Sequence, residues 1–125
     1  WARCLARLSE DLLQSARDLE PLKELTTLVC GPKNAGKSSF CRRLVNTLLN
    51  ANPVVAYLEA DCGQAEFTPP GCVSLTLVDA AIAGPPFMHP RKFARACFIG
   101  DTTPKSDPAL YFNSVLHLVD WYRSQ

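Results

Sequence analysis

Residues 31–39, GPKNAGKSS, contain the spacing G-x-x-x-x-G-K-[ST]. The two glycines permit backbone dihedrals that other residues avoid, so successive N–H groups can point at one anion. The ammonium group of Lys37 can reach the β- and γ-phosphates of a nucleotide, and the hydroxyl of Ser38 can ligate Mg²⁺. The pattern therefore predicts a site for ATP with its magnesium ion.

The whole stretch is assigned to this site because of its context. An apolar, β-branched run precedes it at residues 25–30, and helical spacing of apolar residues follows it. A helix that begins near Lys37 would direct the positive end of its dipole at the phosphates. A glycine-rich turn that matches by chance is the alternative, and this context argues against it. The candidate nucleotide-binding residues are Gly31, Pro32, Lys33, Asn34, Ala35, Gly36, Lys37, Ser38 and Ser39.

A candidate acidic group ends the apolar run VVAYLEAD, residues 54–61. An aspartate at the end of such a strand has the Walker B form, so Asp61 is expected to face Mg²⁺ and the attacking group. Glu59 lies on the same face of the strand and could be nearer the chemistry, although we favour Asp61. The alternative is that Asp61 caps a loop amide. Gln64 could orient a nucleophile or be an ordinary loop residue. The predicted catalytic residues are Lys37, Asp61 and Gln64, and the predicted metal ligands are Ser38 and Asp61.

The apolar spacing also predicts the elements that position these groups. We expect helices over residues 4–19, 37–50 and 107–122, and strands over residues 25–30, 54–60, 72–78 and 93–99. The early strand–helix–strand order favours an α/β fold of the P-loop NTPase type, with a mostly parallel sheet flanked by helices. Loops that leave the carboxyl ends of parallel strands form the ligand crevice, so residues 31–38, 61–71 and 100–107 should meet at one edge.

Composition narrows the class of protein only slightly. The 125 residues are 47% hydrophobic, and 13 basic side chains against 12 acidic ones give a net charge of +1. This balance neither announces nor excludes a nucleic-acid binder. The six cysteines form no CxxC pair, which favours small buried thiols over disulfides or a metal site. No apolar run approaches the roughly 20 residues of a membrane span, so we expect a soluble intracellular protein without a membrane partner.

Three downstream segments resemble the polynucleotide 5′-hydroxyl kinase family. They are DCGQAEFTPPG (61–71), GPPFMHP (84–90) and FIGDTTPKSDPALY (98–111). The resemblance is strongest to the branch of the family that processes pre-ribosomal RNA in the nucleolus. The run D-x-G-Q-x-E-F-T-P-P-G is far more specific than the glycine-rich loop, and the likeness extends from about Thr27 to Tyr122. No NKxD motif for guanine selection occurs, which disfavours a GTPase.

The resemblance implies a kinase that moves the γ-phosphate of ATP to the 5′-hydroxyl of an RNA or DNA end. Asp61 would position or deprotonate that hydroxyl, and Gln64 would lie beside the acceptor. The protein would act in rRNA processing in the nucleus and nucleolus, with other rRNA-processing proteins as partners. It would be organised as an N-terminal helix and connector over residues 1–24, followed by the N-terminal portion of a kinase domain over residues 25–125.

Several other residues keep two interpretations. Thr102, Thr103 and Pro104 match a family loop near the acceptor end, or they form an ordinary turn before a helix. The basic residues Arg91, Lys92 and Arg95 could contact phosphates, but a solvated surface run is favoured. Phe87 could stack on a base, but packing beneath its loop is favoured. His89 and His117 are interpreted as structural, and the sequence offers His89 no visible partner.

The sequence departs from the family at its end. Family members continue with a further strand and an arginine-bearing lid, neither of which is found here, so we expect an incomplete domain. An arginine supplied to the transition state can be worth about 10³ to 10⁵ in rate. A non-catalytic ATP-binding scaffold of an RNA-processing complex is therefore the main alternative, and an unrelated P-loop ATPase or small-molecule kinase is the third.

Overall fold

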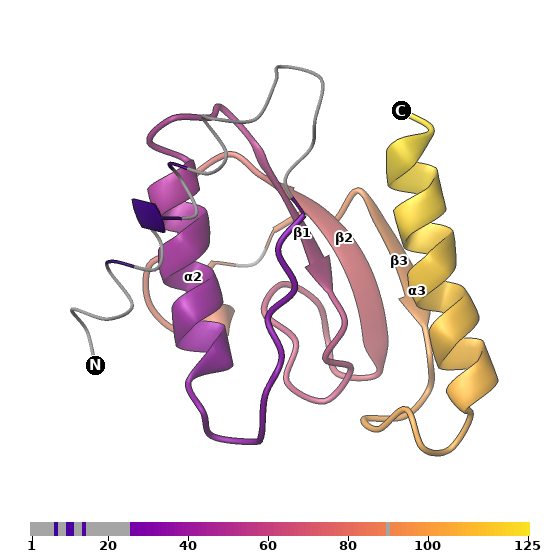
Figure 1. Cartoon of the computed structure of the whole chain (residues 1–125). Coiled ribbons are helices and arrows are strands. Elements are labelled where there is room, and N and C mark those ends of the chain that lie inside the picture. The colour runs from indigo at the N-terminus through magenta and orange to yellow at the C-terminus, as the bar shows by residue number, and fades with distance from the viewer. Residues whose placement is uncertain (1–6, 8–9, 12–13, 15–25, 90) are drawn as a thin grey trace. The chain divides into compact units, whose positions relative to one another are not determined.

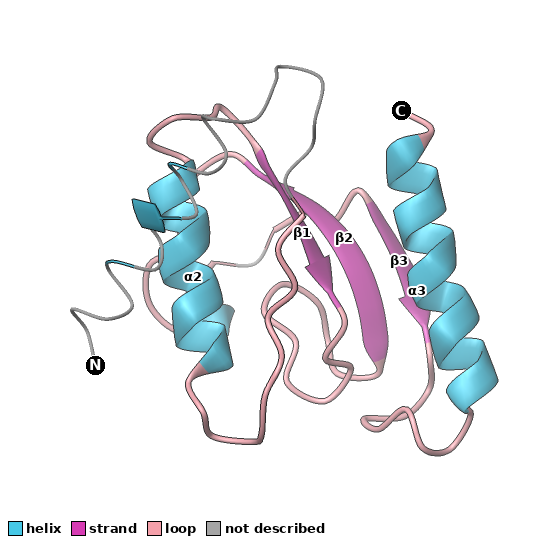
Figure 2. Cartoon of the chain, in the orientation of Figure 1, coloured by secondary structure: helices cyan, strands magenta, loops and turns pink. Residues whose placement is uncertain are grey.

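The computed structural model describes residues 7, 10, 11, 14, 26–89 and 91–125 (Figure 1). The helix expected over residues 4–19 falls outside the described residues, apart from four isolated positions. The described elements, coloured by type in Figure 2, are α2 (Lys37–Leu48), β1 (Val55–Glu59), β2 (Cys72–Val78), the 3₁₀ turn η1 (Pro86–Met88), β3 (Arg95–Phe98) and α3 (Pro108–Arg123). All three predicted strands after residue 50 and both predicted helices after residue 30 are therefore confirmed, with shorter bounds for most of them.

The chain divides into two compact units. The first comprises Trp1–Pro53 with Ala80–Ile82, and the second comprises Val54–Asp79 with Ala83–Gln125. In the first unit, α2 buries Phe40, Leu44 and Val45 along one face. The side-chain amide of Asn46 donates to the carbonyl of Ile82 at 2.9 Å and accepts from its N–H at 2.7 Å. This pair of bonds fixes residues 80–82 to the helix although they lie far along the chain.

The strand expected over residues 25–30 is not formed. Residues 26–30 have no regular structure, and the side chain of Leu28 is 86% exposed. A strand needs ladder hydrogen bonds from a neighbour, and within the described residues no strand pairs with this segment. Its apolar composition alone was a misleading signal for that reason.

The second unit contains a three-stranded sheet in the order β1-β2-β3. Both pairs are antiparallel, with Glu59 opposite Ser74 and Cys72 opposite Phe98. The mostly parallel sheet expected from the sequence is therefore not found among the described strands. The physical reason lies in the connections, because β1–β2 and β2–β3 are joined by loops without a crossover helix, and a parallel pair requires such a crossover.

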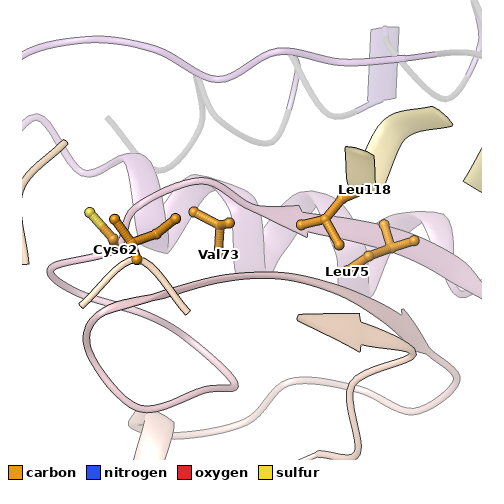
Figure 3. Packing of buried hydrophobic residues seen from close by; sticks show 5 residues of the cluster. Cys62, Val73, Leu75 and Leu118 are labelled. Carbon is orange, nitrogen blue, oxygen red and sulfur yellow. The ribbon is translucent and has the colours of Figure 1, made fainter. Parts of the chain in front are cut away.

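Helix α3 packs against β2 and β3 and closes the core of this unit. Cys62, Val73, Leu75, Ile99 and Leu118 are the buried residues of the cluster, and Figure 3 shows their packing. The carboxylate of Asp107 accepts a bond from the N–H of Leu110 at 2.8 Å, which confirms the predicted N-cap and starting point of the helix. The guanidinium of Arg95 lies 5.0 Å from the ring centre of Trp121 and so holds the helix from the exposed side of β3.

The described cysteines are all free thiols. Cys62 is buried, Cys30 is exposed, and Cys41, Cys72 and Cys97 are partly buried. The expectation of free thiols is thus met at these five positions, but that of full burial holds for Cys62 alone. Among the helices described, none combines the length and the hydropathy that a membrane span requires.

Candidate active site

The glycine-rich loop of the first unit forms a turn that leads directly into α2. Gly36 precedes the helix with φ of 86°, and Asn34 has φ of 63°, both in the left-handed region. Glycine adopts this conformation without strain, so the residue type at position 36 is dictated by the backbone. The ammonium of Lys37 donates to the carbonyl of Pro32 at 2.9 Å, which folds the lysine side chain back along its own loop.

The start of α2 has the character of an anion site. No side chain caps its first turn, and no acidic residue lies there. The first N–H groups of a helix have no partner within the helix, and the dipole makes that end positive. Ser38 and Ser39 lie exposed on this turn. Uncapped amides, the ammonium of Lys37 and two hydroxyls together fit the phosphates of a nucleotide.

Asp61 lies exposed immediately after β1, in the second unit. Its Oδ1 accepts bonds from the N–H groups of Gly63 and Gln64, each at 3.0 Å, while Oδ2 accepts none from the described residues. The alternative interpretation, in which Asp61 caps loop amides, is therefore correct for one of its two carboxylate oxygens. The second oxygen is oriented by these bonds and is available to a metal ion or a hydroxyl group.

Two loops meet at the edge of the sheet where β1 and β3 end. The N–H of Gly71 donates to the carbonyl of Cys62, and the N–H of Ile99 donates to the carbonyl of Gly71, both at 2.7 Å. Gly63 lies so close to residue 102 that an added Cβ would be 2.8 Å from the carbonyl oxygen of Thr102. Loops 61–71 and 100–107 thus leave one edge, as expected, although antiparallel strands bring them there.

Helix α3 and the carboxylate of Asp101 stabilise the loops at this edge of the sheet. The hydroxyl of Tyr111 donates to the carbonyl of Ala60 at 2.9 Å, one residue before Asp61. The carboxylate of Asp101 accepts bonds from the hydroxyl of Ser106 and, at 3.2 Å, from the N–H of Thr103. These bonds lower the pKa of Asp101, with the Ser106 bond the largest cause. The loop that contains Thr102 and Thr103 is therefore a turn held by side-chain hydrogen bonds, and it lies beside the Asp61 loop.

A chain of polar contacts through Glu59, Glu66 and His89, called here the polar chain, supports the Asp61 loop. Oε2 of Glu59 accepts from the N–H of Glu66 at 2.5 Å, and Oε1 of Glu66 lies 2.7 Å from Nε2 of His89. Nδ1 of His89 lies 3.2 Å from the carbonyl oxygen of Ala83. Both ring nitrogens therefore face oxygens, and the chain links β1, the Asp61 loop and the segment before η1.

Burial makes the carboxyl group of Glu59 a weaker acid than usual. Its side chain is 5% exposed, and desolvation raises the pKa of this carboxyl from 4.5 to about 7, against the lowering effect of the Glu66 N–H bond. The nearby carboxylates of Glu66 and Asp61 contribute smaller parts of this rise in pKa. Asp61 is exposed and Glu59 is not, so of the two candidates only Asp61 can meet a ligand directly.

Phe67 packs between the polar chain and the sheet. Its ring makes edge contacts with Tyr57 at 5.3 Å and with His89 at 6.0 Å between centroids. The guanidinium of Arg91 lies 5.8 Å from the same ring, and its NH1 is 3.3 Å from Asp79 Oδ1. The favoured interpretation of Arg91 as a solvated surface residue is therefore wrong, because its side chain is only 15% exposed.

Two further interpretations are corrected here. His89 has a partner, the carboxylate of Glu66, which lies far from it in the sequence. One signal in the sequence could have predicted this pair. Glu66 lies between the apolar residues Ala65 and Phe67, and an acidic side chain buried in such a position needs a cation or a hydrogen-bond donor as its partner. Phe87 does not pack beneath its loop, because its side chain is 82% exposed.

The candidate residues fall in both units. Residues 31–39, with Lys37 and Ser38, belong to the first, whereas Asp61 and Gln64 belong to the second. Within each unit the predicted groups are brought together, at the start of α2 and in the turn after β1 respectively. Gln64 is exposed, and its N–H is one of the two that bond Asp61.

Comparison with known proteins identifies the sequence relatives of the chain. Residues 31–125 match the family model described as "mRNA cleavage and polyadenylation factor CLP1 P-loop". The match covers both the glycine-rich loop and the Asp61 loop. It supports the P-loop fold expected from the sequence.

Curated relatives carry the name polynucleotide 5′-hydroxyl-kinase. The NOL9 protein of Arabidopsis thaliana is 46% identical over 82% of this chain and 28% of its own length. Human NOL9 is 43% identical over 78% of this chain and 14% of its own length. The GRC3 protein of Cryptococcus neoformans is 37% identical over 98% of this chain and 16% of its own length. The chain thus spans between 14% and 28% of these relatives.

Proposed function

Because the chain belongs to the CLP1 P-loop family, we propose that it forms the ATP-binding and acceptor part of a polynucleotide 5′-hydroxyl kinase of rRNA processing. The observation that carries this proposal is its 37–46% identity, over 78–98% of its length, to relatives named as such kinases. The product would be a 5′-phosphorylated RNA or DNA end. Residues 25–125 would be the kinase portion and residues 1–24 its N-terminal extension.

The glycine-rich loop would bind the triphosphate of ATP. The uncapped amides at the start of α2 would donate to phosphate oxygens, and Lys37 would exchange its bond to the Pro32 carbonyl for one to the β- and γ-phosphates. Ser38 and Asp61 supply oxygens of the hard kind that Mg²⁺ prefers. The ion, when bound, would neutralise charge that develops on the transferred phosphate.

The Asp61 loop would position the acceptor. The open Oδ2 of Asp61 is oriented by the two amide bonds to Oδ1, so it can accept the proton of a 5′-hydroxyl as the bond from that oxygen to the γ-phosphorus forms and the bond from the γ-phosphorus to ADP breaks. Gln64, on the same turn, would hold the acceptor sugar or hydroxyl beside it. RNA ends are the proposed substrate, and the nucleolus and other rRNA-processing proteins are the proposed setting and partners.

An end-labelling assay tests this function. The protein is incubated with γ-labelled ATP and Mg²⁺, and with a 5′-hydroxyl RNA, a free nucleoside or water as the acceptor. We expect label on the RNA ends, and its loss in Lys37→Ala together with the loss of ATP binding. Arg43→Ala removes an exposed cation of the same helix and serves as the matched control. Label on the nucleoside or release to water would contradict the proposal, as would unchanged ATP affinity in Lys37→Ala.

A further inference from the structure

Phe87 is exposed although the segment around it is firmly held. The side chain of Phe87 is 82% exposed and that of its neighbour Met88 is 66% exposed. Single exposed apolar residues are common on protein surfaces and need no explanation by themselves. A large aromatic ring held in solvent on a fixed backbone is different, because its display has a structural cause.

The fixation comes from both ends of the segment. The N–H of Met88 donates to the carbonyl of Pro85 at 2.9 Å, and the N–H of His89 donates to the carbonyl of Pro86 at 3.2 Å. Two prolines restrict φ on the approach to the ring. Met88 lies back over Gly84, where an added Cβ would be 3.2 Å from the methionine sulfur. The ring of Phe87 is thus presented before any ligand arrives.

The segment is tied to the loop that carries Asp61. His89 Nε2 lies 2.7 Å from the carboxylate of Glu66, which belongs to the loop beginning at Asp61. The ring of His89 also packs against Phe67 of that loop. Phe87 therefore stands on a segment whose position is set by the proposed acceptor loop, within the same unit of the chain.

The charge of the surrounding sequence favours a polyanion. Residues 83–95 contain three basic side chains and no acidic one. Lys92 is exposed, whereas Arg91 is engaged with Asp79 and Arg95 with Trp121. Phe87 and Lys92 are both exposed and lie five residues apart in the sequence, and an aromatic ring together with a cation are the groups with which proteins bind single-stranded nucleic acid, by stacking and by phosphate contact.

We propose that Phe87 is a stacking platform for a base near the 5′ end of the single-stranded polynucleotide. Lys92 would contact the phosphate backbone of the same strand. This inference rests on the proposed function and extends it by naming where the substrate strand is held beyond its terminal hydroxyl. Stacking tolerates every base, so the platform would bind ends without selecting their sequence. Rigidity of the segment reduces the entropy lost when the strand binds.

Binding of a 3′-labelled, 5′-hydroxyl RNA oligonucleotide, followed by fluorescence anisotropy, tests the platform. Phe87→Ala should weaken binding about 5- to 150-fold, the effect of one stacked base. Phe87→Tyr should keep the affinity, and Phe87→Leu should not restore it, because leucine is apolar but has no π face. Phe112→Ala is the matched control, since Phe112 is 59% exposed on α3.

Oligonucleotides with one abasic position identify the stacked base. At one position near the 5′ end, removal of the base should weaken binding to the unaltered protein but not to Phe87→Ala. Equal binding by Phe87→Ala and Phe112→Ala would overturn the platform and leave the kinase proposal standing. A Phe87→Ala effect that is the same at every abasic position would also overturn it, because no single base would then be stacked on Phe87. Absence of RNA binding by the unaltered protein would contradict both proposals.

Discussion

Two carboxylates near the end of β1 have opposite environments. Asp61 is exposed, with one oxygen held by two loop amides and the other open. Glu59 is buried, and its pKa is raised to about 7 by desolvation. This contrast supports Asp61 as the group that meets the acceptor and Glu59 as the group that holds the loop.

Glu59 should make stability depend on pH. Its pKa is 4.5 in the unfolded chain and about 7 in the folded one, so the folded state binds the proton more tightly. The resulting stabilisation is fully present below the unfolded value and is lost as pH rises through about 7. Relative to Glu59→Gln, the free energy of unfolding of the unaltered protein should fall by roughly 3 kcal/mol across this window.

Urea unfolding at a series of pH values, with EDTA present, measures this difference. Asp120→Asn, which alters an exposed carboxylate on α3, should leave the pH profile unchanged. If the unaltered protein and Glu59→Gln keep a constant difference from pH 4 to 8, the burial of Glu59 does not control the stability.

At the scale of the elements, patterns among neighbouring residues predicted those helices and strands whose formation depends on local interactions. The strand over residues 72–78 and the helix that begins after Asp107 were predicted with their bounds, because alternation and an N-cap followed by proline are encoded in neighbouring residues. The start of α2 after the glycine-rich loop was predicted for the same reason. Strand pairing depends on distant segments, and so the antiparallel sheet and the missing strand at residues 26–30 were not predicted.

The Glu66–His89 pair shows the same limit within the site. The two residues come together only because the Asp61 loop and the segment before β3 fold over one face, a result of the sheet as a whole. Once formed, the pair is buried, with side-chain exposures of 4% for Glu66 and 9% for His89. We infer that it fastens the two loops to each other, as a positioning device rather than a catalytic one.

Breaking this pair should be costly. His89→Gln removes the imidazole that lies 2.7 Å from the buried carboxylate of Glu66, which should lower the free energy of unfolding by about 1 to 3 kcal/mol. The double variant Glu66→Gln/His89→Gln should recover part of that loss, because two amides can bond each other. His117→Gln, at an exposed histidine on α3 whose Nε2 lies 3.2 Å from Arg95, is the matched control and should change stability little, because this contact is solvent-exposed. Additive losses in thermal or urea unfolding, without recovery in the double variant, would show that the two residues are not coupled.

At the scale of the whole molecule, the two units each contribute one half of the proposed reaction. The first carries the loop for the triphosphate, and the second carries the loop for the acceptor. The chain itself is almost neutral, with 13 basic and 12 acidic residues, so its net charge adds no strong attraction for RNA. The proposed function would have one nucleotide-bound metal ion serve both loops.

Replacement of Mg²⁺ by paramagnetic Mn²⁺ tests that arrangement directly. In the presence of an unhydrolysable ATP analogue, Mn²⁺ should broaden the amide NMR signals of Gly36 and Ser38 and also those of Cys62 and Gln64. The amide of Arg123 should be broadened much less, because it lies about 18 Å along α3 from Tyr111, which bonds the residue before Asp61. Lys37→Ala should abolish all broadening through loss of the nucleotide. Broadening confined to the first unit would mean that Asp61 does not approach the metal, and that the acceptor loop works without it.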